Sequence, residues 1–205
     1  LAAKVPEVTI VSGLAYGIDV IAHKAAMESG ISTIIIPAHG LDRIYPSVHR
    51  SVAIQALDKG GILTEYTTGI EPERYNFVAR NRIVAGMADT VVVVESKAKG
   101  GSLITAHMAQ DYNRDVFALP GRYCDVCSAG CNELIKHNKA QLIECADDLI
   151  KAMRWETVKK KAEQTTMLEL MYDLTDQQQQ LVNLLRESEE GIHINQLVIE
   201  TQLAY

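Results

Sequence analysis

The chain has 205 residues, of which 47% are hydrophobic and 22% are charged, and it carries a formal net charge of −6. That length and composition predict one substantial hydrophobic core beside a small second module, and they exclude a disordered chain. No apolar run approaches the roughly 20 residues that a membrane-spanning helix needs, so we expect no membrane segment. The acidic net charge argues against a surface coated in basic residues, although it is compatible with a local basic groove.

Short, nearly continuous apolar runs alternate with helical segments over the first 150 residues. The expected strands are residues 8–12, 32–36, 61–65, 90–95 and 115–119, and the expected helices are residues 17–29, 47–59, 75–88 and 102–112. Because strands that are apolar on both faces belong to parallel sheets covered by helices on both sides, the alternation predicts a doubly wound, mostly parallel α/β fold. Ligands of such sheets bind beyond the carboxyl ends of the strands, so the loops after each strand are the expected site.

A change in composition after the last of these elements indicates a second part of the chain. Thr175 and Gln178 match a capping box that opens a helix. The start at Leu1, without an initiator Met or a signal-peptide pattern, indicates a fragment. The expected parts are an α/β domain at residues 1–153, a charged linker or solvated helix at 154–173, and an incomplete, all-α, winged-helix-like module at 174–205.

The first predicted strand is followed by two glycines, Gly13 and Gly17, with Tyr16 between them and a helix after them. Backbone amides at such a helix start can bind an anionic group such as a phosphate. The segment is neither a Walker loop nor a G-x-G-x-x-G fingerprint. Two interpretations therefore stay open: a phosphate-binding turn, and a plain tight turn in which Asp19 complements the helix dipole.

The loop after the second predicted strand, residues 37–46, combines glycine with a cation and an aromatic residue. In a binding site, Arg43 can meet a phosphate and Tyr45 can stack on a base. In the alternative, the loop is a turn in which Tyr45 and Pro46 pack on the edge of the sheet.

The helix predicted at residues 75–88 carries the triplet Arg80-Asn81-Arg82. We expect its apolar residues to face the sheet while Arg80 and Asn81 project away from it. Two guanidiniums on either side of an amide suit several phosphate oxygens, because Arg presents a rigid fork of donors. The alternative is a solvated helix face paired with Glu71 and Glu73, but the position near a strand end favours the binding site.

A second glycine pair, Gly100-Gly101, opens the helix predicted at residues 102–112, and Ser102 and Thr105 add hydroxyls to its first turn. These groups form a second amide-rich anion site. Two such sites on one rim, joined by the arginines of the triplet, predict a channel for several successive phosphates rather than a pocket for one nucleotide.

The sequence gives little support for a catalytic or metal site. It has no G-x-S-x-G or H-E-x-x-H motif, His23 is expected to be a packed or capping residue, and we expect neither enzymatic turnover nor a cofactor. Cys124, Cys127 and Cys131 have the spacing C-x2-C-x3-C, which is compatible with a metal site. Because no second ligand pair completes such a site, we interpret the cysteines as free cytosolic thiols.

Several motifs occur in one order between residues 8 and 145. They are S-G-L-A-x-G-I-D at 12–19, G-L-D-x-I-Y-P at 40–46, R-N-R-I at 80–83, G-S-L-I-T-A at 101–106, L-P-G at 119–121 and G-C-N-x-L-I at 130–135. In this combination the chain resembles the DNA-processing protein A family (DprA, also called Smf). The resemblance implies an extended Rossmann-like fold and a cytoplasmic homodimer that binds single-stranded DNA cooperatively, protects incoming DNA and loads the RecA recombinase in natural transformation.

The resemblance also implies which residues bind DNA. Carried over position by position, the family's pocket falls on Gly13, Gly17, Arg80, Asn81, Arg82, Gly101, Ser102 and Thr105. Tyr16 stands where the family often has Arg. The tyrosine either replaces an ionic contact to a phosphate with stacking on a base or weakens the contact with DNA at this position. The family's preceding strand, its Gly-x-Arg loop and its N-terminal helical domain are absent from this sequence, so part of the expected pocket is missing.

Two other functions remain as alternatives. Rossmann-like phosphoribohydrolases of the lysine-decarboxylase-like group hydrolyse nucleotide N-glycosidic bonds and use the motif P-G-G-x-G-T-x-x-E, but the helix after Gly100 and Gly101 lacks the matching Glu. A nucleotide sensor without DNA affinity is the other alternative. It predicts saturable binding of mononucleotides with no preference for longer strands.

Overall fold

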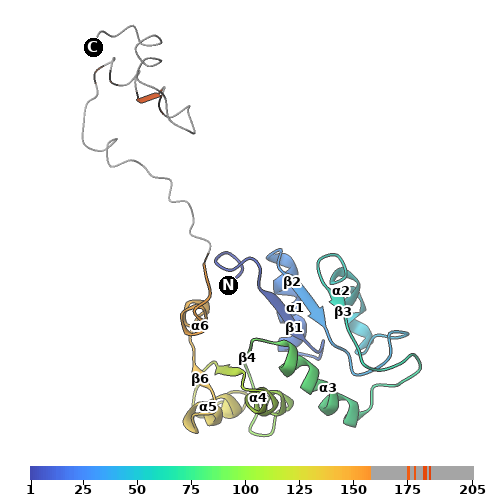
Figure 1. Cartoon of the computed structure of the whole chain (residues 1–205). Helices are drawn as coiled ribbons and strands as arrows, with labels where there is room; N and C mark the ends of the chain where they lie inside the picture. The colour runs from blue at the N-terminus through green and yellow to red at the C-terminus, as the bar shows by residue number, and fades with distance from the viewer. Residues whose placement is uncertain (158–174, 176–177, 179–181, 184, 186–205) are drawn as a thin grey trace. The chain divides into compact units, whose positions relative to one another are not determined.

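The computed structural model describes residues 1–157 together with residues 175, 178, 182, 183 and 185 (Figure 1). The chain divides into two compact units, Leu1–Val158 and Lys159–Tyr205. Within the described residues, the first unit contains six short strands, six α-helices and one 3-10 helix. The candidate functional residues all belong to this unit.

The first parallel sheet has the strand order β1-β2-β3. Its strands are β1 (Thr9–Ser12), β2 (Ser32–Ile35) and β3 (Gly61–Ile62), and they are connected by α1 (Ile18–Glu28), the 3-10 helix η1 (Ser47–His49) and α2 (Arg50–Gln55). Thr9 pairs with Ser32, and Ile34 pairs with Gly61. Gly60 passes so close to the carbonyl of Thr33 that a Cβ atom has no room there, so a glycine lets the chain enter β3 beside β2.

The second parallel sheet has the strand order β4-β5-β6. Its elements are β4 (Thr90–Val93), α4 (Gly101–Asp111), β5 (Asp115–Ala118), α5 (Ala129–Lys136), β6 (Gln141–Leu142) and α6 (Ala146–Met153). Thr90 pairs with Asp115, and Phe117 pairs with Gln141. Helix α3 (Arg74–Met87) carries the chain from the first sheet to the second and packs against both β1 and α4 (Figure 1).

This arrangement confirms the predicted α/β class, in which parallel strands alternate with helices. The orders 3-2-1 and 4-5-6 correspond to the two halves of the strand order 3-2-1-4-5-6 of doubly wound folds. In the part of the chain that the structure describes they form two separate sheets, because no ladder joins β1 to β4. The helix expected at residues 47–59 is shorter than predicted. It begins with a 3-10 turn after Pro46, and its end is tightened by i to i+3 hydrogen bonds such as the one from Leu57 N–H to the carbonyl of Ile54, at 3.1 Å.

Separate hydrophobic clusters lie under the two sheets. The cluster of the first sheet consists of Leu14, Val20, Ile35, Val52, Ala53 and Ala56. The main cluster of the second consists of Ala85, Val93, Ala106, Ala109, Val116, Ala118, Cys131, Leu134 and Ala140. The many alanines let α3 and α4 approach β4 and β5 closely, which fixes the loops that follow the strands.

The second unit contains the predicted capping box. Thr175 N–H donates to Gln178 Oε1 at 3.0 Å, and Gln178 N–H donates to Thr175 Oγ1 at 3.4 Å. The linker and the winged-helix-like module proposed for residues 154–205 otherwise lie outside the described residues, apart from 154–157, 182, 183 and 185. None of the helices in the described ranges has both the length and the hydropathy that crossing a bilayer requires.

Candidate functional site

The loop between β1 and α1 is closed by a carboxylate of the chain itself. Asp19 Oδ2 accepts hydrogen bonds from the backbone amides of Gly13, at 3.1 Å, and Ala15, at 3.2 Å. Leu14 lies buried between them with a left-handed φ of 64°. Because these two amides are already bound to an anion of the protein, they are not free to receive a phosphate.

Tyr16 and Gly17 remain accessible at the start of α1. Gly17 is the N-cap of the helix and has a φ of 84°, a conformation that favours glycine. Tyr16 is 70% exposed, and its ring meets the ring of His49 edge-on at a centroid distance of 5.0 Å. His49 itself is buried, and its Nδ1 lies 2.9 Å from the carbonyl oxygen of Leu14. His49 therefore fixes the loop while Tyr16 stays open to solvent.

Arg80 lies inside the protein, not on its surface. It is 4% exposed, and its Nη1 donates to the carbonyl of Gly13, at 3.1 Å, and to the carbonyl of Ile36. The guanidinium occupies the space next to Gly13, where a Cβ atom would collide with it. Burial lowers the pKa of the guanidinium, and the nearby Asp19 carboxylate partly offsets this effect. The expectation that Arg80 projects away from the sheet is wrong, because Arg80 ties the carboxyl ends of β1 and β2 together.

Arg82 and Asn81 differ from Arg80 in their surroundings. Residues two apart on an α-helix point to different sides, and Arg82 is accordingly half-exposed and forms an ion pair with Glu65. Asn81 is partly exposed, and its side chain has no hydrogen-bond partner among the described residues. The triplet therefore does not present two guanidiniums on one face. Arg82 can still meet a phosphate if its exposed, weak ion pair with Glu65 opens.

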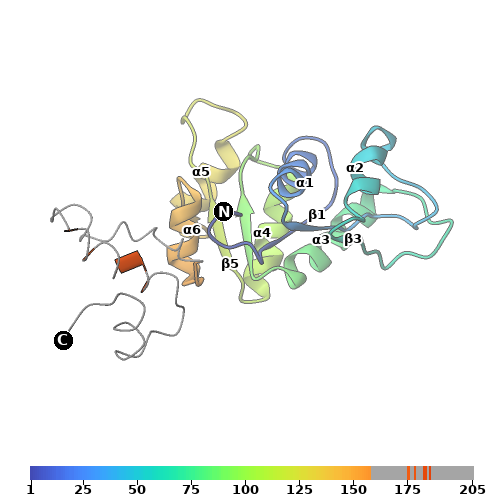
Figure 2. The same ribbon diagram turned by 90° about the horizontal axis from the view of Figure 1, so that it is seen from above.

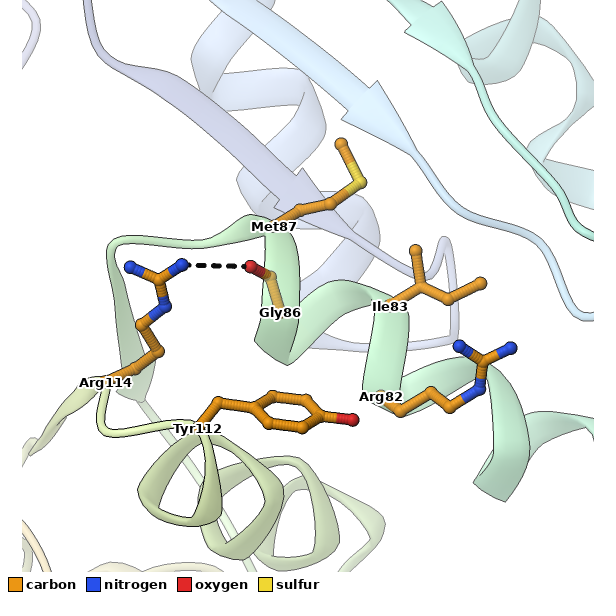
Figure 3. Close-up of a pocket in the computed structure, with 6 residues that line it drawn as sticks. All are labelled: Arg82, Ile83, Gly86, Met87, Tyr112 and Arg114. Atoms are coloured by element: carbon orange, nitrogen blue, oxygen red, sulfur yellow. Dashed lines mark hydrogen bonds between the residues drawn. The ribbon is translucent and has the colours of Figure 1, made fainter.

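Arg82 also lines an open hollow of about 500 Å³ between α3 and the end of α4 (Figure 3). The other lining residues are Ile83, Gly86, Met87, Tyr112 and Arg114. Arg114 Nη2 donates to the carbonyl of Gly86 at 3.3 Å. Tyr112 and Arg114 lie just ahead of β5, so their side of the hollow is at the amino end of that strand.

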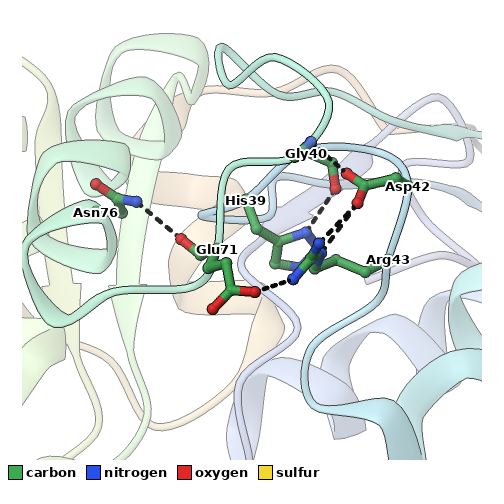
Figure 4. A network of polar contacts seen from close by, with 7 residues as sticks. His39, Gly40, Asp42, Arg43, Glu71 and Asn76 are labelled. Atoms are coloured by element: carbon green, nitrogen blue, oxygen red, sulfur yellow. Dashed lines mark hydrogen bonds and ion pairs between the residues drawn. The ribbon is translucent and has the colours of Figure 1, made fainter.

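Arg43 is neutralised by two carboxylates (Figure 4). Its Nη2 lies 3.0 Å from Asp42 Oδ2, and its Nη1 lies 2.7 Å from Glu71 Oε1. The amide of Gly69 donates to Asp42 Oδ1 at 3.0 Å, and this bond together with the contact to Arg43 lowers the pKa of Asp42. Arg43 must therefore break its own ion pairs before it can meet a phosphate.

His39 organises the same loop and was not singled out by the sequence analysis. It is 1% exposed, and its Nε2 accepts the amide of Tyr45 at 3.1 Å, which leaves Nδ1 to donate to the carbonyl of Gly40 at 2.8 Å. Pro46 is buried, and the ring of Tyr45 lies 5.9 Å from that of Phe77. Pro46 is thus packed inside, whereas Tyr45 is 48% exposed and its ring meets a residue of α3 rather than the edge of the sheet. The signal in the sequence was a histidine directly before a glycine at the end of an apolar strand.

At the start of α4 no carboxylate of the described residues accepts a hydrogen bond, in contrast to the start of α1. Gly100 is the N-cap, and Gly101 is exposed with nothing within 4 Å of the position of a Cβ atom. The side chains there that have no polar partner among the described residues are Lys97, Lys99, Ser102 and Thr105. The Gly100 N–H donates to the carbonyl of Lys97 at 3.0 Å and the Leu103 N–H donates to the carbonyl of Gly100 at 3.2 Å, which leaves the Gly101 and Ser102 amides without a backbone partner among the described residues. These two amides, with the hydroxyls and the two lysines, form a geometry that can bind a phosphate.

His23 is a packed residue, as predicted. It is fully buried, its Nδ1 lies 2.6 Å from Thr33 Oγ1, and the Thr33 hydroxyl donates to the carbonyl of Ile10 at 3.0 Å. Burial lowers the pKa of His23 to about 4, so the ring is neutral at physiological pH. A neutral histidine without solvent access has no route to a substrate.

The three cysteines of the C-x2-C-x3-C run lie in different environments. Cys124 and Cys127 are exposed, whereas Cys131 is buried and its Sγ lies 3.5 Å from the carbonyl oxygen of Val93. Burial raises the pKa of the Cys131 thiol. Within the described residues, no three His, Cys, Asp or Glu side chains gather so that they could hold a metal ion.

The predicted site residues thus fall into three settings. Arg80 is buried against Gly13, whose amide is bound to Asp19, and Arg43 and Arg82 are held in ion pairs. Tyr16, Gly17, Asn81, Gly101, Ser102 and Thr105 are at least partly accessible. The accessible groups at the two helix starts follow β1 and β4, at the carboxyl ends of the strands.

Parallel strands with glycine-rich helix starts beyond their carboxyl ends define a Rossmann-like binding domain. Within that class, the chain belongs to the DNA recombination-mediator protein A family, whose family model matches residues 2–154. The chain is similar to the DNA processing protein DprA of Streptococcus pneumoniae, with 42% identity over 144 residues that cover 70% of this chain and 51% of that protein. It is also similar to protein Smf of Synechocystis sp., with 47% identity over 146 residues, which are 71% of this chain and 36% of that protein.

Two solved structures of DNA processing protein A are similar to this chain, in agreement with the family assignment. The X-ray structure of the Streptococcus pneumoniae protein matches with a TM-score of 0.65 and 42% identity, over 70% of this chain and 50% of that one. DNA processing protein A from Helicobacter pylori, in a structure that describes its single-stranded DNA binding mode, matches with a TM-score of 0.63 and 36% identity, over 71% of this chain and 66% of that one. The chain spans about half or less of the length of the curated relatives described above.

Proposed function

We propose that this chain is the Rossmann-like core of a cytoplasmic protein that binds and protects single-stranded DNA and loads the RecA recombinase during recombination and natural transformation. The observation that carries the proposal is the start of α4, where exposed Gly101, the Ser102 hydroxyl and the lysines before them have no polar partner among the described residues. Membership of the family and the binding mode described for the Helicobacter pylori relative support it.

In this proposal the single strand of DNA runs along the carboxyl ends of strands β1 and β4. One phosphate binds the amides and hydroxyls at the start of α4, and another part of the strand lies beside Tyr16 and Gly17 at the start of α1. Arg82 contacts a further phosphate of the DNA when its ion pair with Glu65 opens. Arg80 acts indirectly, because it holds the ends of β1 and β2 in place from inside the protein.

Binding without turnover is the other part of the proposal. Asp19 and Asp42 accept backbone hydrogen bonds, Glu65 is held in an ion pair, and His23 is buried, so these groups are committed to structure. The resemblance to the family supports a homodimer and contact with the RecA recombinase as part of the same function.

A salt titration of oligothymidine binding tests the proposal. Each phosphate contact on a single strand releases counterions, so the affinity falls by about 0.7 log units per log unit of salt for every contact. We expect a slope that corresponds to several contacts, and weaker binding of a duplex of equal length. An affinity that does not depend on salt, or an equal affinity for the duplex, would contradict the proposal.

A further inference from the structure

The loop between β5 and α5, residues 119–128, presents an aromatic side chain that nothing in the described part of the chain covers. Tyr123 is 97% exposed, and the neighbouring Arg122 is exposed as well. Neither side chain makes a hydrogen bond, ion pair or ring contact with the described residues. Because an exposed ring contributes no burial energy to the fold, Tyr123 is available to a ligand.

The loop that carries Tyr123 is held in one shape by its own polar contacts. The amide of Asn132 brackets Gly121, accepting the Gly121 N–H at 3.1 Å and donating to its carbonyl at 3.0 Å. Asp125 accepts the Cys127 N–H at 3.0 Å and the Ser128 hydroxyl at 3.1 Å. A Cβ atom at Gly121 would collide with Ser128, so the closure needs glycine there. A ligand therefore meets a loop that is already ordered, which lowers the entropy lost on binding.

The same loop is joined to the segment that leads into α4. Ser96 N–H donates to the carbonyl of Cys127, and Gly130 N–H donates to the carbonyl of Ser96, both at 2.8 Å. A Cβ atom at Gly130 would lie 2.6 Å from the carbonyl oxygen of Lys97, so the two segments touch. Figure 2 shows the β5–α5 loop standing beside the loop that follows β4. The α5 end of the loop therefore touches the segment that leads into α4, and Arg122 and Tyr123 lie in the same loop.

An aromatic ring beside a guanidinium suits one kind of ligand in particular. Bases of single-stranded DNA stack on exposed tyrosine rings, and Arg adds a phosphate contact. The three cations Arg122, Lys97 and Lys99 outnumber the exposed carboxylates Glu95 and Asp125 of the same two loops, which suits a polyanion. The exposed large apolar side chains of the β5–α5 loop are only Tyr123 and Val126. Such a small apolar patch favours a strand of DNA over a protein partner.

We propose that Tyr123 is a stacking platform for one unpaired base and that Arg122 contacts an adjacent phosphate, so that the β5–α5 loop extends the DNA path beyond the start of α4. This inference rests on the proposed function. It gives the order of the protein elements along the DNA path: the start of α1, then the start of α4, then the β5–α5 loop.

Four substitutions at position 123 test the inference by fluorescence anisotropy with labelled oligothymidine. Tyr123→Ser and Tyr123→Leu remove the aromatic face, whereas Tyr123→Phe and Tyr123→Trp keep it. We expect the first two to weaken binding by about fivefold or more and the last two to bind like the wild type. The emission of Tyr123→Trp should be quenched by DNA beyond any change at Trp155, the one tryptophan of the wild-type chain. Arg122→Gln should lower the salt slope by about 0.7.

The outcomes separate this inference from the function on which it rests. If Tyr123→Ser binds as tightly as a wild type that shows the expected salt slope, the stacking platform is refuted and the proposed function stands. If Tyr123→Leu binds as well as Tyr123→Phe, the contact is merely apolar and stacking is again refuted. If the wild-type chain does not bind oligothymidine at all, both proposals are overturned.

Discussion

Arg80 and Arg82 are two residues apart in α3 and have opposite surroundings. Arg80 is a buried cation whose guanidinium bonds to the carbonyls of Gly13 and Ile36. Arg82 lies at the surface, in an ion pair that solvent screens. The two residues therefore serve different purposes, although they form one motif in the sequence.

Substituting each arginine separately should reveal this difference. Arg80→Ala leaves two carbonyls without a donor and a cavity at the ends of β1 and β2, so we expect it to lower the free energy of unfolding by about 2 kcal/mol or more. Arg82→Ala should change stability by less than about 1 kcal/mol, while it weakens oligothymidine binding and lowers the salt slope. Urea denaturation of both variants measures the first effect. An equal loss of stability in the two variants would show that Arg80 has no special structural role.

Among the helices, α4 differs from α1 because its first turn is open to an anion. At the start of α1, Asp19 takes the place of a bound phosphate by accepting the amides of Gly13 and Ala15. Gly101 at the start of α4 has free space around it and no positive φ. A side chain can therefore be introduced there without strain.

Gly101→Asp should block the anion site with a carboxylate. Because acidic residues at a helix start interact favourably with the dipole, we expect unchanged or slightly raised thermal stability. The affinity for oligothymidine should fall by at least about tenfold, since like charges then face each other. Gly101→Asn is the matched neutral control and should lose much less. If the Asp and Asn variants bind equally well, the start of α4 is not a phosphate site.

The alternation of strands and helices could be predicted because β-branched runs and glycine helix ends mark these elements in the sequence. The orientation of α3 could not. Apolar residues such as Phe77, Val78 and Ile83 are spread around this helix, so its periodicity does not say which side faces the sheet. Arg80 faces inward because two strand-end carbonyls lie there to receive it, and this is a tertiary contact that local sequence patterns do not contain.

The same reasoning explains what was found and missed at the candidate site. The glycine-rich starts of α1 and α4 have a local signature, and both lie at the carboxyl ends of strands as expected. The internal partners of Asp19 and Arg43 depend on how the loops fold back. Tyr123 was missed because an exposed aromatic residue in a loop has no pattern that distinguishes it from an ordinary surface residue.

On the scale of the whole first unit, two parallel half-sheets place their loops along an extended edge. A single pocket for one nucleotide needs convergent groups around one point. Here the accessible groups are distributed over the starts of α1 and α4 and the β5–α5 loop. That distribution suits a flexible polyanion, and it is the central claim of the proposed function.

A length series of oligothymidines, measured by fluorescence anisotropy at one salt concentration, tests this claim most directly. If several phosphates and bases bind along the edge, the affinity should rise steeply from the mononucleotide to longer strands and then level off when the path is filled. Excess thymidine monophosphate should displace the longer strands poorly. If the mononucleotide binds as tightly as the longest strand, the protein holds a single nucleotide and the DNA path does not exist.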